Sequence, residues 1–309
     1  MVNPDDVDFS RHANELRHKL GRVGVWWSLP MTGPASDARD VAAEIEQLGY
    51  TALWYGESAT TKDTFVQAAI LLAATSELKV ATGIANVWSR AAATAVAGAA
   101  ALGEAFDDRF LLGLGISHAP HVSLIGGHYG RPLTTVRHYL DAMDEAPYPG
   151  ARPAGGVRRV LAALRPGMVR LASERAAGAH PYFVSVEHTA RTREILGPQP
   201  LLAPEQAFVL ETDPVRARAL SRGHMAHYLE MPNYVNHLRE LGYHDEDIAA
   251  GGSDRLVDAI VAWGDVDAVA TRVQAHLDAG ADHVSLQPLG DFATGTAALR
   301  VAAPTLTAL

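Results

Sequence analysis

Residues 79–118 read KVATGIANVWSRAAATAVAGAAALGEAFDDRFLLGLGISH and form the clearest structural unit of the chain. The apolar runs 79–85 and 109–115 predict two strands, and the alanine-rich run 91–105 between them predicts a helix. Consecutive strands joined by a helical crossover lie parallel in one sheet. This stretch therefore predicts a parallel sheet with helices packed against it.

The same alternation of strand and helix continues on both sides of this unit. Further strands are predicted at 23–29, 51–55, 157–163, 179–185, 206–211 and 283–288. Further helices are predicted at 37–48, 63–74, 134–145, 167–177, 187–196 and 294–309. Eight strands with their helices predict a single α/β domain, a (β/α)8 TIM barrel, with a doubly wound open sheet as the structural alternative.

The barrel is expected to fill residues 22–309, after an N-terminal extension at 1–21 that carries a short polar helix. A helical insertion is predicted at about 214–264, before the last strand. The Pro/Gly-rich segment 146–156 is interpreted as a surface loop, because the strand–helix alternation continues beyond it.

Composition excludes several classes of function. The 309 residues carry a net charge of −9 and no basic run, which is unfavourable for nucleic-acid binding. The chain has no cysteine, so disulfides and thiolate chemistry are excluded. Neither a signal-peptide core nor a run of about 20 apolar residues is present, and a soluble, cytoplasmic protein is expected.

Polar and aromatic side chains follow the predicted strands, at the end where a barrel places its active site. Glu57 and Ser58 follow strand 51–55, and Asn86 precedes Trp88 after strand 79–85. Four tryptophans near strand ends suit a planar, apolar ligand such as a flavin ring, namely Trp26, Trp27, Trp54 and Trp88.

Two other interpretations of this region are weaker. Gly113-Leu114-Gly115 lacks the third glycine of a dinucleotide fingerprint and lies within a strand, so we interpret both glycines as room for close packing. His118 and His121 invite a metal-hydrolase interpretation, but few carboxylates accompany them and no metal is expected.

Three segments together resemble the luciferase-like monooxygenase superfamily: EIEQLGYTALWYGES (44–58), ATGIANVWSR (81–90) and DDRFLLGLGISH (107–118). The resemblance is dense over 23–140 and returns at 262–287. Within the superfamily, the segments GIANVWSR, GLGISHAP and AHPYFV resemble the branch that uses the 8-hydroxy-5-deazaflavin coenzyme F420.

This resemblance implies roles for individual residues. Gly83–Ile84 matches a non-prolyl cis peptide that lies behind the deazaflavin ring, while Glu57 and Asn86 match polar contacts to that ring. His118 stands where some relatives carry a glutamate proton donor, and Ser58 stands where some carry histidine. Their acid–base pair therefore does not transfer, although His118 could relay a proton, since its pKa is expected to lie near neutrality.

The remaining assignments follow from the same resemblance. A coenzyme phosphate is expected at the helix start after strand 157–163, held by Arg165, Gly167 and Met168. Ser117 and Tyr182 are further predicted coenzyme contacts, and His118 and Glu57 are the predicted catalytic residues. The substrate pocket is expected to include Trp27, Ser58, Trp88 and His121.

The expected function is hydride transfer between coenzyme F420 and a small organic substrate by a homodimeric enzyme. One alternative is a two-component monooxygenase that uses FMN on the same fold. A second alternative is a non-catalytic protein that binds a flavin or deazaflavin, which the two departures at His118 and Ser58 favour. The insertions 119–131 and 232–252 are expected to shape the substrate pocket.

Overall fold

The computed structural model of the protein describes residues 8–28, 31–58 and 60–309. Within these residues the strands are short and mostly buried on both faces, as a parallel sheet covered by helices requires. The strands are β1 (Val23–Trp26), β2 (Ala52–Tyr55), β3 (Lys79–Thr82), β4 (Ala85–Asn86), β5 (Phe110–Gly115), β6 (Arg159–Leu161), β7 (Gly178–Ala179), β8 (Leu201–Leu202), β9 (Glu205–Leu210), β10 (Ala262–Gly264) and β11 (Val284–Pro288).

Every strand pair is parallel, in the order β10-β9-β11-β1-β2-β3-β5-β6-β7-β8, with β4 also paired to β5. β8 and β9 are separated by two residues and act as one interrupted barrel strand. On one side the Glu205 N–H donates to the Pro181 carbonyl at 2.9 Å, and on the other the Ser285 N–H donates to the Pro204 carbonyl at 3.0 Å. The sheet therefore closes on itself, and the predicted TIM-barrel fold is confirmed.

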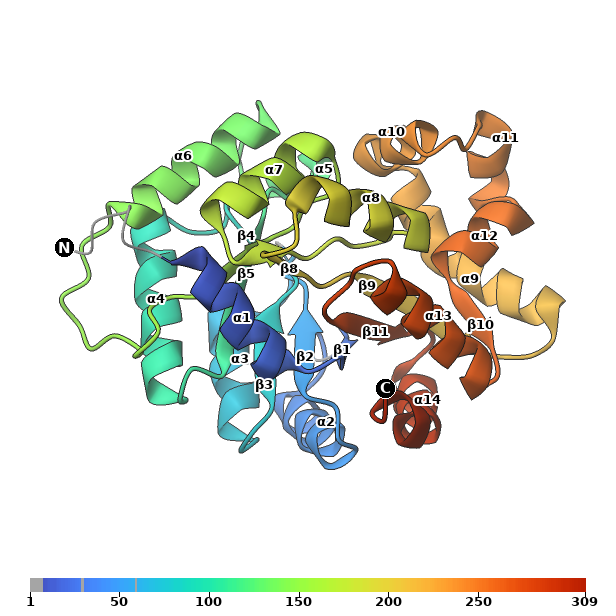
Figure 1. The fold of residues 1–309 in the computed structure, drawn as a ribbon, viewed down its shortest axis with the longest axis horizontal. Coiled ribbons are helices and arrows are strands. Elements are labelled where there is room, and N and C mark those ends of the chain that lie inside the picture. Colours follow the sequence, from blue (N-terminus) through green and yellow to red (C-terminus); the bar gives the residue numbers. More distant parts are fainter. Residues whose placement is uncertain (1–7, 29–30, 59) are drawn as a thin grey trace.

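Helices surround this barrel (Figure 1). They are α1 (Phe9–Leu20), α2 (Ala35–Gln47), α3 (Thr64–Ala73), α4 (Ala92–Ala105), α5 (Ala119–Leu124), α6 (Pro132–Asp144), α7 (Pro166–Arg175), α8 (Val186–Leu196), α9 (Pro214–Leu229), α10 (Pro232–Glu240), α11 (Asp245–Ile248), α12 (Asp254–Ile260), α13 (Val266–Asp278) and α14 (Phe292–Leu306). α9 to α12 occupy the segment in which the sequence predicts a helical insertion, and they gather on one side of the barrel in Figure 1.

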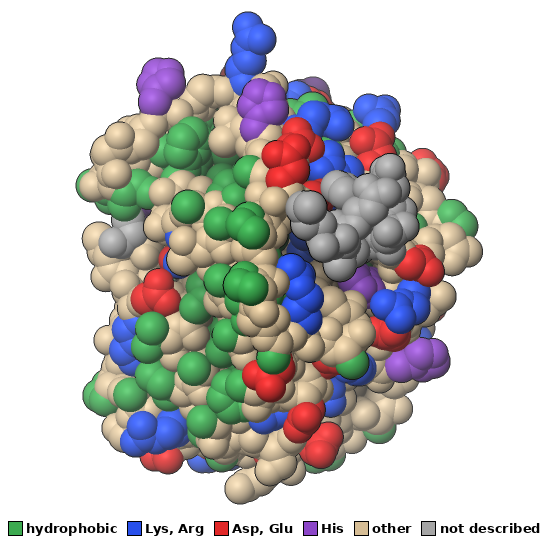
Figure 2. All heavy atoms as spheres, turned by 90° about the vertical axis from the view of Figure 1, so that its left-hand side faces the viewer, with side chains coloured by type: hydrophobic (Ala, Val, Ile, Leu, Met, Phe, Trp, Pro, Cys, Tyr) green, Lys and Arg blue, Asp and Glu red, His purple; other side chains and the backbone are tan. Residues whose placement is uncertain are grey.

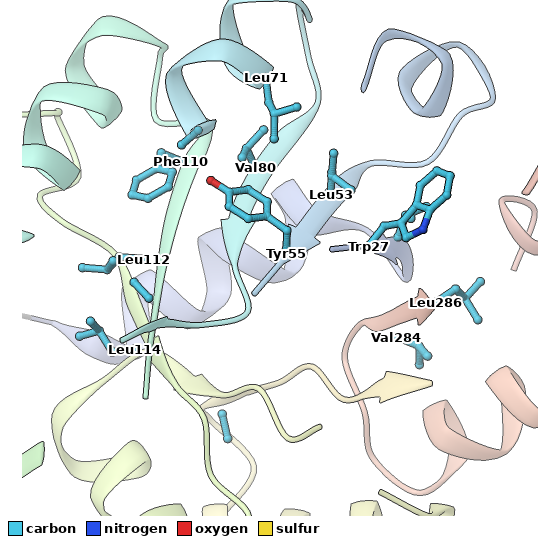
Figure 3. Close-up of a cluster of buried hydrophobic side chains, with 14 of the residues drawn as sticks. Trp27, Leu53, Tyr55, Leu71, Val80, Phe110, Leu112, Leu114, Val284 and Leu286 are labelled. Atoms are coloured by element: carbon cyan, nitrogen blue, oxygen red, sulfur yellow. The ribbon is translucent and has the colours of Figure 1, made fainter. Parts of the chain in front are cut away.

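Buried apolar side chains form three clusters. The largest lies between the strands and the helices, where Tyr55, Val80 and Phe110 gather near Leu71 of α3 (Figure 3). A second, the insertion cluster, packs α9, α10 and α12 onto β9. The third, which we call the lumen cluster, fills the barrel interior and consists of Ala13, Leu16, Leu20, Trp26, Ala52, Trp54, Ala81, Leu111, Val160, Ala177, Leu201 and Ala203.

α1 contributes the first three members of the lumen cluster. These apolar residues recur along one side of the helix, and each is at most 4% exposed. Asp8 caps the helix by accepting a hydrogen bond from the Arg11 N–H at 2.9 Å. Because β1 begins three residues after Leu20, α1 covers the amino ends of the barrel strands and leaves the carboxyl ends open for a site.

The element boundaries differ from the prediction mainly in the second half of the chain. The strand predicted at 179–185 is reduced to β7, because Pro181 has no N–H to donate and Phe183 adopts a positive φ of 59°. The strand predicted at 206–211 begins earlier, at β8. α5 and β10 were not predicted. The predicted strand end at residue 29 and residues 1–7 of the predicted extension lie outside the described residues.

Candidate active site

The candidate site begins where the third barrel strand is interrupted between β3 and β4. The Gly83–Ile84 peptide bond in this interruption is cis, as the sequence resemblance predicts. The end of β2 holds it on both sides: the Gly83 N–H donates to the Tyr55 carbonyl at 2.7 Å, and the Glu57 N–H donates to the Ile84 carbonyl at 3.1 Å. A main-chain bulge is thereby fixed at the carboxyl edge of the barrel.

Two polar aromatic side chains press against Gly83. A Cβ at this position would lie 2.6 Å from Trp26 Nε1 and 2.8 Å from His180 Nε2, so the site requires glycine. Both of those nitrogens are buried and have no hydrogen-bond partner within the described residues. The His180 ring stacks on Trp54 with 4.3 Å between centroids. These rings form an aromatic floor beneath the bulge.

His180 is an acceptor in this floor. Its Nδ1 lies 2.7 Å from the Ala203 carbonyl and must donate to it, which leaves a lone pair on Nε2. Burial lowers the pKa of His180 to about 4, so the ring is neutral at neutral pH. His180 was not predicted as a site residue, because the strand predicted at 179–185 placed it within a strand and not at a strand end.

The glycine pair of β5 accommodates the other side of the interrupted strand. A Cβ at Gly113 would lie 1.9 Å from the Thr82 carbonyl oxygen, and one at Gly115 would lie 2.7 Å from Ile84 Cγ1. Close packing of the bulge therefore explains both glycines, as predicted, and no dinucleotide fingerprint is needed to account for them.

Glu57 is committed to protein partners. One carboxylate oxygen accepts from the Asn86 N–H at 2.7 Å, and both oxygens bind the Arg90 guanidinium. The side chains of Glu57 and Arg90 are only 6% and 9% exposed, and Arg90 also lies 4.7 Å from the centre of the Phe65 ring. In this structure Glu57 thus fixes the end of β4.

Replacing Glu57 with Gln is expected to lower the free energy of unfolding by about 3 kcal/mol, because it leaves the buried Arg90 charge without its main counterion. Gln can still accept from the Asn86 N–H, so the loss reports the charge pair. Urea denaturation followed by circular dichroism measures it. Glu174→Gln is the matched control, since its 3.9 Å pair with Arg137 is half exposed and should cost under about 0.5 kcal/mol. Equal losses in the two variants would contradict this account.

His118 follows β5 and meets the insertion. Its Nδ1 donates to Asn233 Oδ1 at 3.1 Å, and its ring lies 5.4 Å from Tyr234 and 6.0 Å from His121. Burial lowers the pKa of His118 to about 4. The expectation that its pKa lies near neutrality is therefore wrong: at neutral pH the ring is uncharged and presents Nε2 as an acceptor.

Other predicted residues surround the same edge. Asn86 Oδ1 accepts from the Trp88 N–H at 3.1 Å, and the Ser117 carbonyl accepts from the Tyr129 hydroxyl at 3.1 Å. The Ser58 N–H donates to the Thr61 hydroxyl at 3.1 Å in a turn after β2. The Trp88 Nε1 is buried without a partner in the described ranges.

Trp27 is a correction to the predicted substrate pocket. β1 alternates, so that Trp26 points into the lumen while Val25 and Trp27 belong to the layer under the helices. Trp27 is 3% exposed and stacks on Phe292 of α14 with 5.5 Å between ring centroids. Trp27 is therefore a core residue, and Trp26 is the tryptophan of β1 that faces the lumen.

The predicted anion site at the start of α7 is partly occupied by the protein itself. The Met168 N–H donates to the Arg165 carbonyl at 2.9 Å, and the Arg165 guanidinium pairs with Glu240 of α10. Arg165 remains 53% exposed, so an anion could compete for its guanidinium. Two of the three residues predicted to bind the phosphate, Arg165 and Met168, already have protein partners. Gly167 lies beside them in the first turn of α7.

Tyr182 brings the insertion into contact with the lumen. Its hydroxyl donates to Gln287 Oε1 at 2.8 Å and lies 2.7 Å from the Tyr228 hydroxyl of α9. Its ring lies 4.8 Å from that of Trp26. Tyr182 was predicted as a coenzyme contact, whereas Tyr228 was not, because nothing in the sequence shows that α9 folds back over this loop.

A cavity of about 1080 Å³ lies elsewhere, between α1, α6 and the loop before β6. It is lined by Phe9, His12, Val96, Met143, Tyr148 and Pro153, among others. The adjoining face carries many apolar side chains (Figure 2). Because this cavity lies near the amino end of β6, it is distinct from the candidate site.

No group of three or more His, Asp or Glu side chains within residues 8–28, 31–58 and 60–309 is arranged to hold a metal ion. In the same part of the chain, every helix is too short or too polar to cross a membrane.

Comparison with known proteins gives consistent matches. The model of the luciferase-like monooxygenase family matches residues 20–283. The 5,10-methylenetetrahydromethanopterin reductase of Methanolobus tindarius is 25% identical over 203 residues, which cover 57% of this chain and 62% of that protein. The alignment thus spans less than two thirds of that relative.

Solved structures share the fold. The coenzyme F420-dependent tetrahydromethanopterin reductase of Methanopyrus kandleri superposes with a TM-score of 0.74 at 15% identity, over 92% of this chain and 98% of that one. The oxygenating constituent of 3,6-diketocamphane monooxygenase of Pseudomonas putida, in complex with FMN, gives 0.69 at 16% identity, over 93% and 98%. At these sequence identities the likeness establishes the fold. The first of these two proteins is described as dependent on coenzyme F420, and the second was solved in complex with FMN.

Proposed function

Because the chain belongs to the luciferase-like monooxygenase family, whose members are oxidoreductases, we propose that it is an oxidoreductase that uses coenzyme F420. In this proposal a small organic substrate would enter between α5 and the insertion, and the bound coenzyme would supply hydride chemistry to it. FMN is the second candidate coenzyme, favoured by the FMN-bound neighbour of the same fold.

The observation that carries the proposal is the buried Trp26 Nε1–H, which lies against Gly83 at the bulge and has no hydrogen-bond partner within the described residues. A planar heterocycle needs an apolar surface with a few fixed polar groups at its edge. The bulge, the buried Trp26 and Trp88 Nε1–H groups and the partly buried Tyr182 are chemically suited to such a ring. The residues present therefore fit a flavin or deazaflavin.

When bound, the coenzyme supplies hydride chemistry at its ring, and the chain supplies position and proton management. Asn86, fixed through Glu57, would hold a polar edge of the ring. His118, neutral at neutral pH, would accept a hydrogen bond through Nε2. Arg165 would exchange Glu240 for a coenzyme phosphate at the start of α7.

The proposal is tested by titrating the protein with oxidised F420 and with FMN while following tryptophan fluorescence. We expect F420 to bind at least tenfold more tightly than FMN, and Asn86→Ala to weaken that binding at least tenfold. Asn14→Ala on α1, whose side chain is exposed, is the matched control and should change the dissociation constant less than twofold. Tighter binding of FMN would overturn the choice of coenzyme.

A second measurement separates an enzyme from a binding protein. Reduced F420 is mixed with a panel of ketones, imines and activated alkenes, and its oxidation is followed by absorbance. We expect turnover with at least one class. Stoichiometric binding without oxidation across the panel would instead support the non-catalytic alternative that the departures at His118 and Ser58 favour.

A further inference from the structure

The last residue of α10 bears on the choice between the two candidate coenzymes. Glu240 ends this helix, and both its side chain and its main chain bind arginines. Its carboxylate pairs with the Arg165 guanidinium, and its carbonyl accepts from Arg191 Nη1 at 3.3 Å. Arg165 is the cation that the proposed function assigns to the coenzyme phosphate. A negative charge of the insertion therefore lies on the group that should attract an anion.

The backbone of Glu240 is held in place, because α10 is anchored along its length. Near the start of the helix, Asn233 Oδ1 accepts from His118 Nδ1 at 3.1 Å. In the middle, the buried Tyr234 belongs to the insertion cluster. Near the end, the ring of the buried His237 lies 4.6 Å from a histidine ring of α8. The Glu240 side chain is 43% exposed and can rotate, but its charge stays beside the start of α7.

Each cation beside Glu240 already has a negative partner. Arg165 pairs with Glu240, and Arg191 pairs with Glu187 of α8 at 2.6 Å. Burial lowers the pKa of His237 to about 3, so this neighbour on α10 is uncharged at neutral pH. These side-chain charges therefore cancel one another at the start of α7.

The main chain at the start of α7 still attracts an anion. The Gly167 N–H has no hydrogen-bond partner in the described part of the chain, and it lies at the positive end of the helix dipole. That end corresponds to roughly half an elementary charge. It can offset part of a single negative charge, but it leaves most of a double charge unbalanced.

The two candidate coenzymes differ in the charge of their phosphate. FMN carries a phosphate monoester with close to two negative charges at neutral pH, whereas the phosphate of F420 is a diester with one. Because the Coulomb energy is proportional to charge, the Glu240 carboxylate raises the free energy of a bound monoester about twice as much as that of a diester.

We propose that Glu240 is a specificity-determining residue, which removes the electrostatic advantage of a doubly charged phosphate monoester and so favours a coenzyme with a singly charged phosphodiester. This inference rests on the proposed function, in which Arg165 binds the coenzyme phosphate. It assigns part of the discrimination between F420 and FMN to one side chain of the insertion.

Glu240 could instead serve only to hold α10 against α7. Riboflavin separates the two roles, because it has the ring of FMN without the phosphate. A purely structural role predicts that Glu240→Gln changes the affinities for riboflavin and FMN by the same factor. An electrostatic role predicts a change for FMN and none for riboflavin.

The first test titrates the wild type and Glu240→Gln with oxidised F420, FMN and riboflavin while following tryptophan fluorescence. We expect Glu240→Gln to bind F420 about threefold and FMN about ninefold more tightly, because doubling the charge squares the fold-change. Riboflavin affinity should change less than twofold. Glu174→Gln, which removes an exposed acid from the far end of α7, is the control and should change each affinity less than twofold.

Equal gains for FMN and F420 in Glu240→Gln, or equal gains for FMN and riboflavin, would overturn the proposal. Absence of binding of all three compounds to the wild type would instead refute the proposed function. The second test then decides on Glu240, because it needs no coenzyme.

The second test follows the Gly167 amide by NMR at pH 8 during titration with inorganic phosphate, mostly a dianion, and with dimethyl phosphate, a monoanion. We expect the midpoint for Glu240→Gln to lie at about ninefold lower phosphate and about threefold lower dimethyl phosphate than for the wild type. Glu174→Gln should behave as the wild type does. Equal midpoints in Glu240→Gln and the wild type, or a Gly167 amide that responds to neither anion in either protein, would refute the role of Glu240.

Discussion

Replacing Gly113 with alanine is expected to lower the free energy of unfolding by more than about 4 kcal/mol or to prevent folding altogether. The added Cβ would lie 1.9 Å from the Thr82 carbonyl oxygen, which belongs to the backbone and cannot rotate away. Relief requires β5 to separate from β3 and β4, the two halves of the interrupted strand, both of which pair with it. Urea denaturation followed by circular dichroism measures the loss.

Gly223→Ala is the matched control for this substitution. Gly223 lies inside α9, and a Cβ there would meet no atom within 4 Å. The same change should therefore stabilise the protein by up to about 1 kcal/mol, because alanine favours the helix. If both variants unfolded at the same urea concentration, close packing at Gly113 would not be what holds the bulge.

Replacing Glu205 with Gln is expected to make the protein increasingly more stable than the wild type as the pH rises. Burial on folding raises the pKa of Glu205 from 4.5 to about 8, so the native state holds the proton more tightly than the unfolded state. The wild type therefore loses stability as pH rises from about 4.5 to about 8, by roughly 5 kcal/mol at ~1.4 kcal/mol per pH unit. Gln removes that loss.

The measurement is the difference between the unfolding free energies of the two proteins at pH 5, 7 and 9. Groups that titrate equally in the wild type and in Glu205→Gln cancel when the two unfolding free energies are subtracted. The difference therefore reports the contribution of Glu205 alone. Glu174→Gln, which removes an exposed carboxyl group, should give a difference that is flat with pH. A flat difference for Glu205→Gln as well would mean that the buried carboxyl group is ionised in the native protein.

The alternation of strand and helix was enough to predict the barrel, because each apolar run is short and each helix has a clear start and stop. It failed at 179–185, where an apolar run continues but Pro181 and the positive φ of Phe183 end the ladder. It also missed β10, whose three residues carry no period that a sequence pattern could detect. Short strands in a barrel are fixed by their neighbours more than by their own residues.

Site residues that belong to a sequence motif could be predicted. Residues whose orientation or burial depends on tertiary packing could not. The Gly83–Ile84 cis peptide followed from the family resemblance. Trp26 and Trp27 were both predicted near a strand end, and only packing shows that Trp26 faces the lumen while Trp27 lies under the helices, because successive residues of a strand point to opposite faces. His118 was expected to titrate near neutrality because burial by the insertion cannot be seen in the sequence.

Glu205 was missed for a related reason. It lies at the start of β9, and the prediction began that strand one residue later. The signal was present as alternation: Leu201 and Ala203 precede Glu205, and Ala207 and Val209 follow it, all at intervals of two. An acid within a run of alternating apolar residues indicates either a salt bridge or a neutral buried carboxyl group.

The position of α1 also constrains the order in which the molecule can be assembled. During synthesis this helix is made well before the segments that it contacts, because Arg17 binds Asp282, which is 265 residues further along, and the Gln199 carbonyl, 182 residues further along. A 12-residue helix is marginal on its own. Its apolar side must therefore wait until Leu201 and Ala203 of the lumen cluster have been translated, and Arg17 must wait for Asp282. These distant contacts imply a late folding step and a long period in which a chaperone could bind that helix.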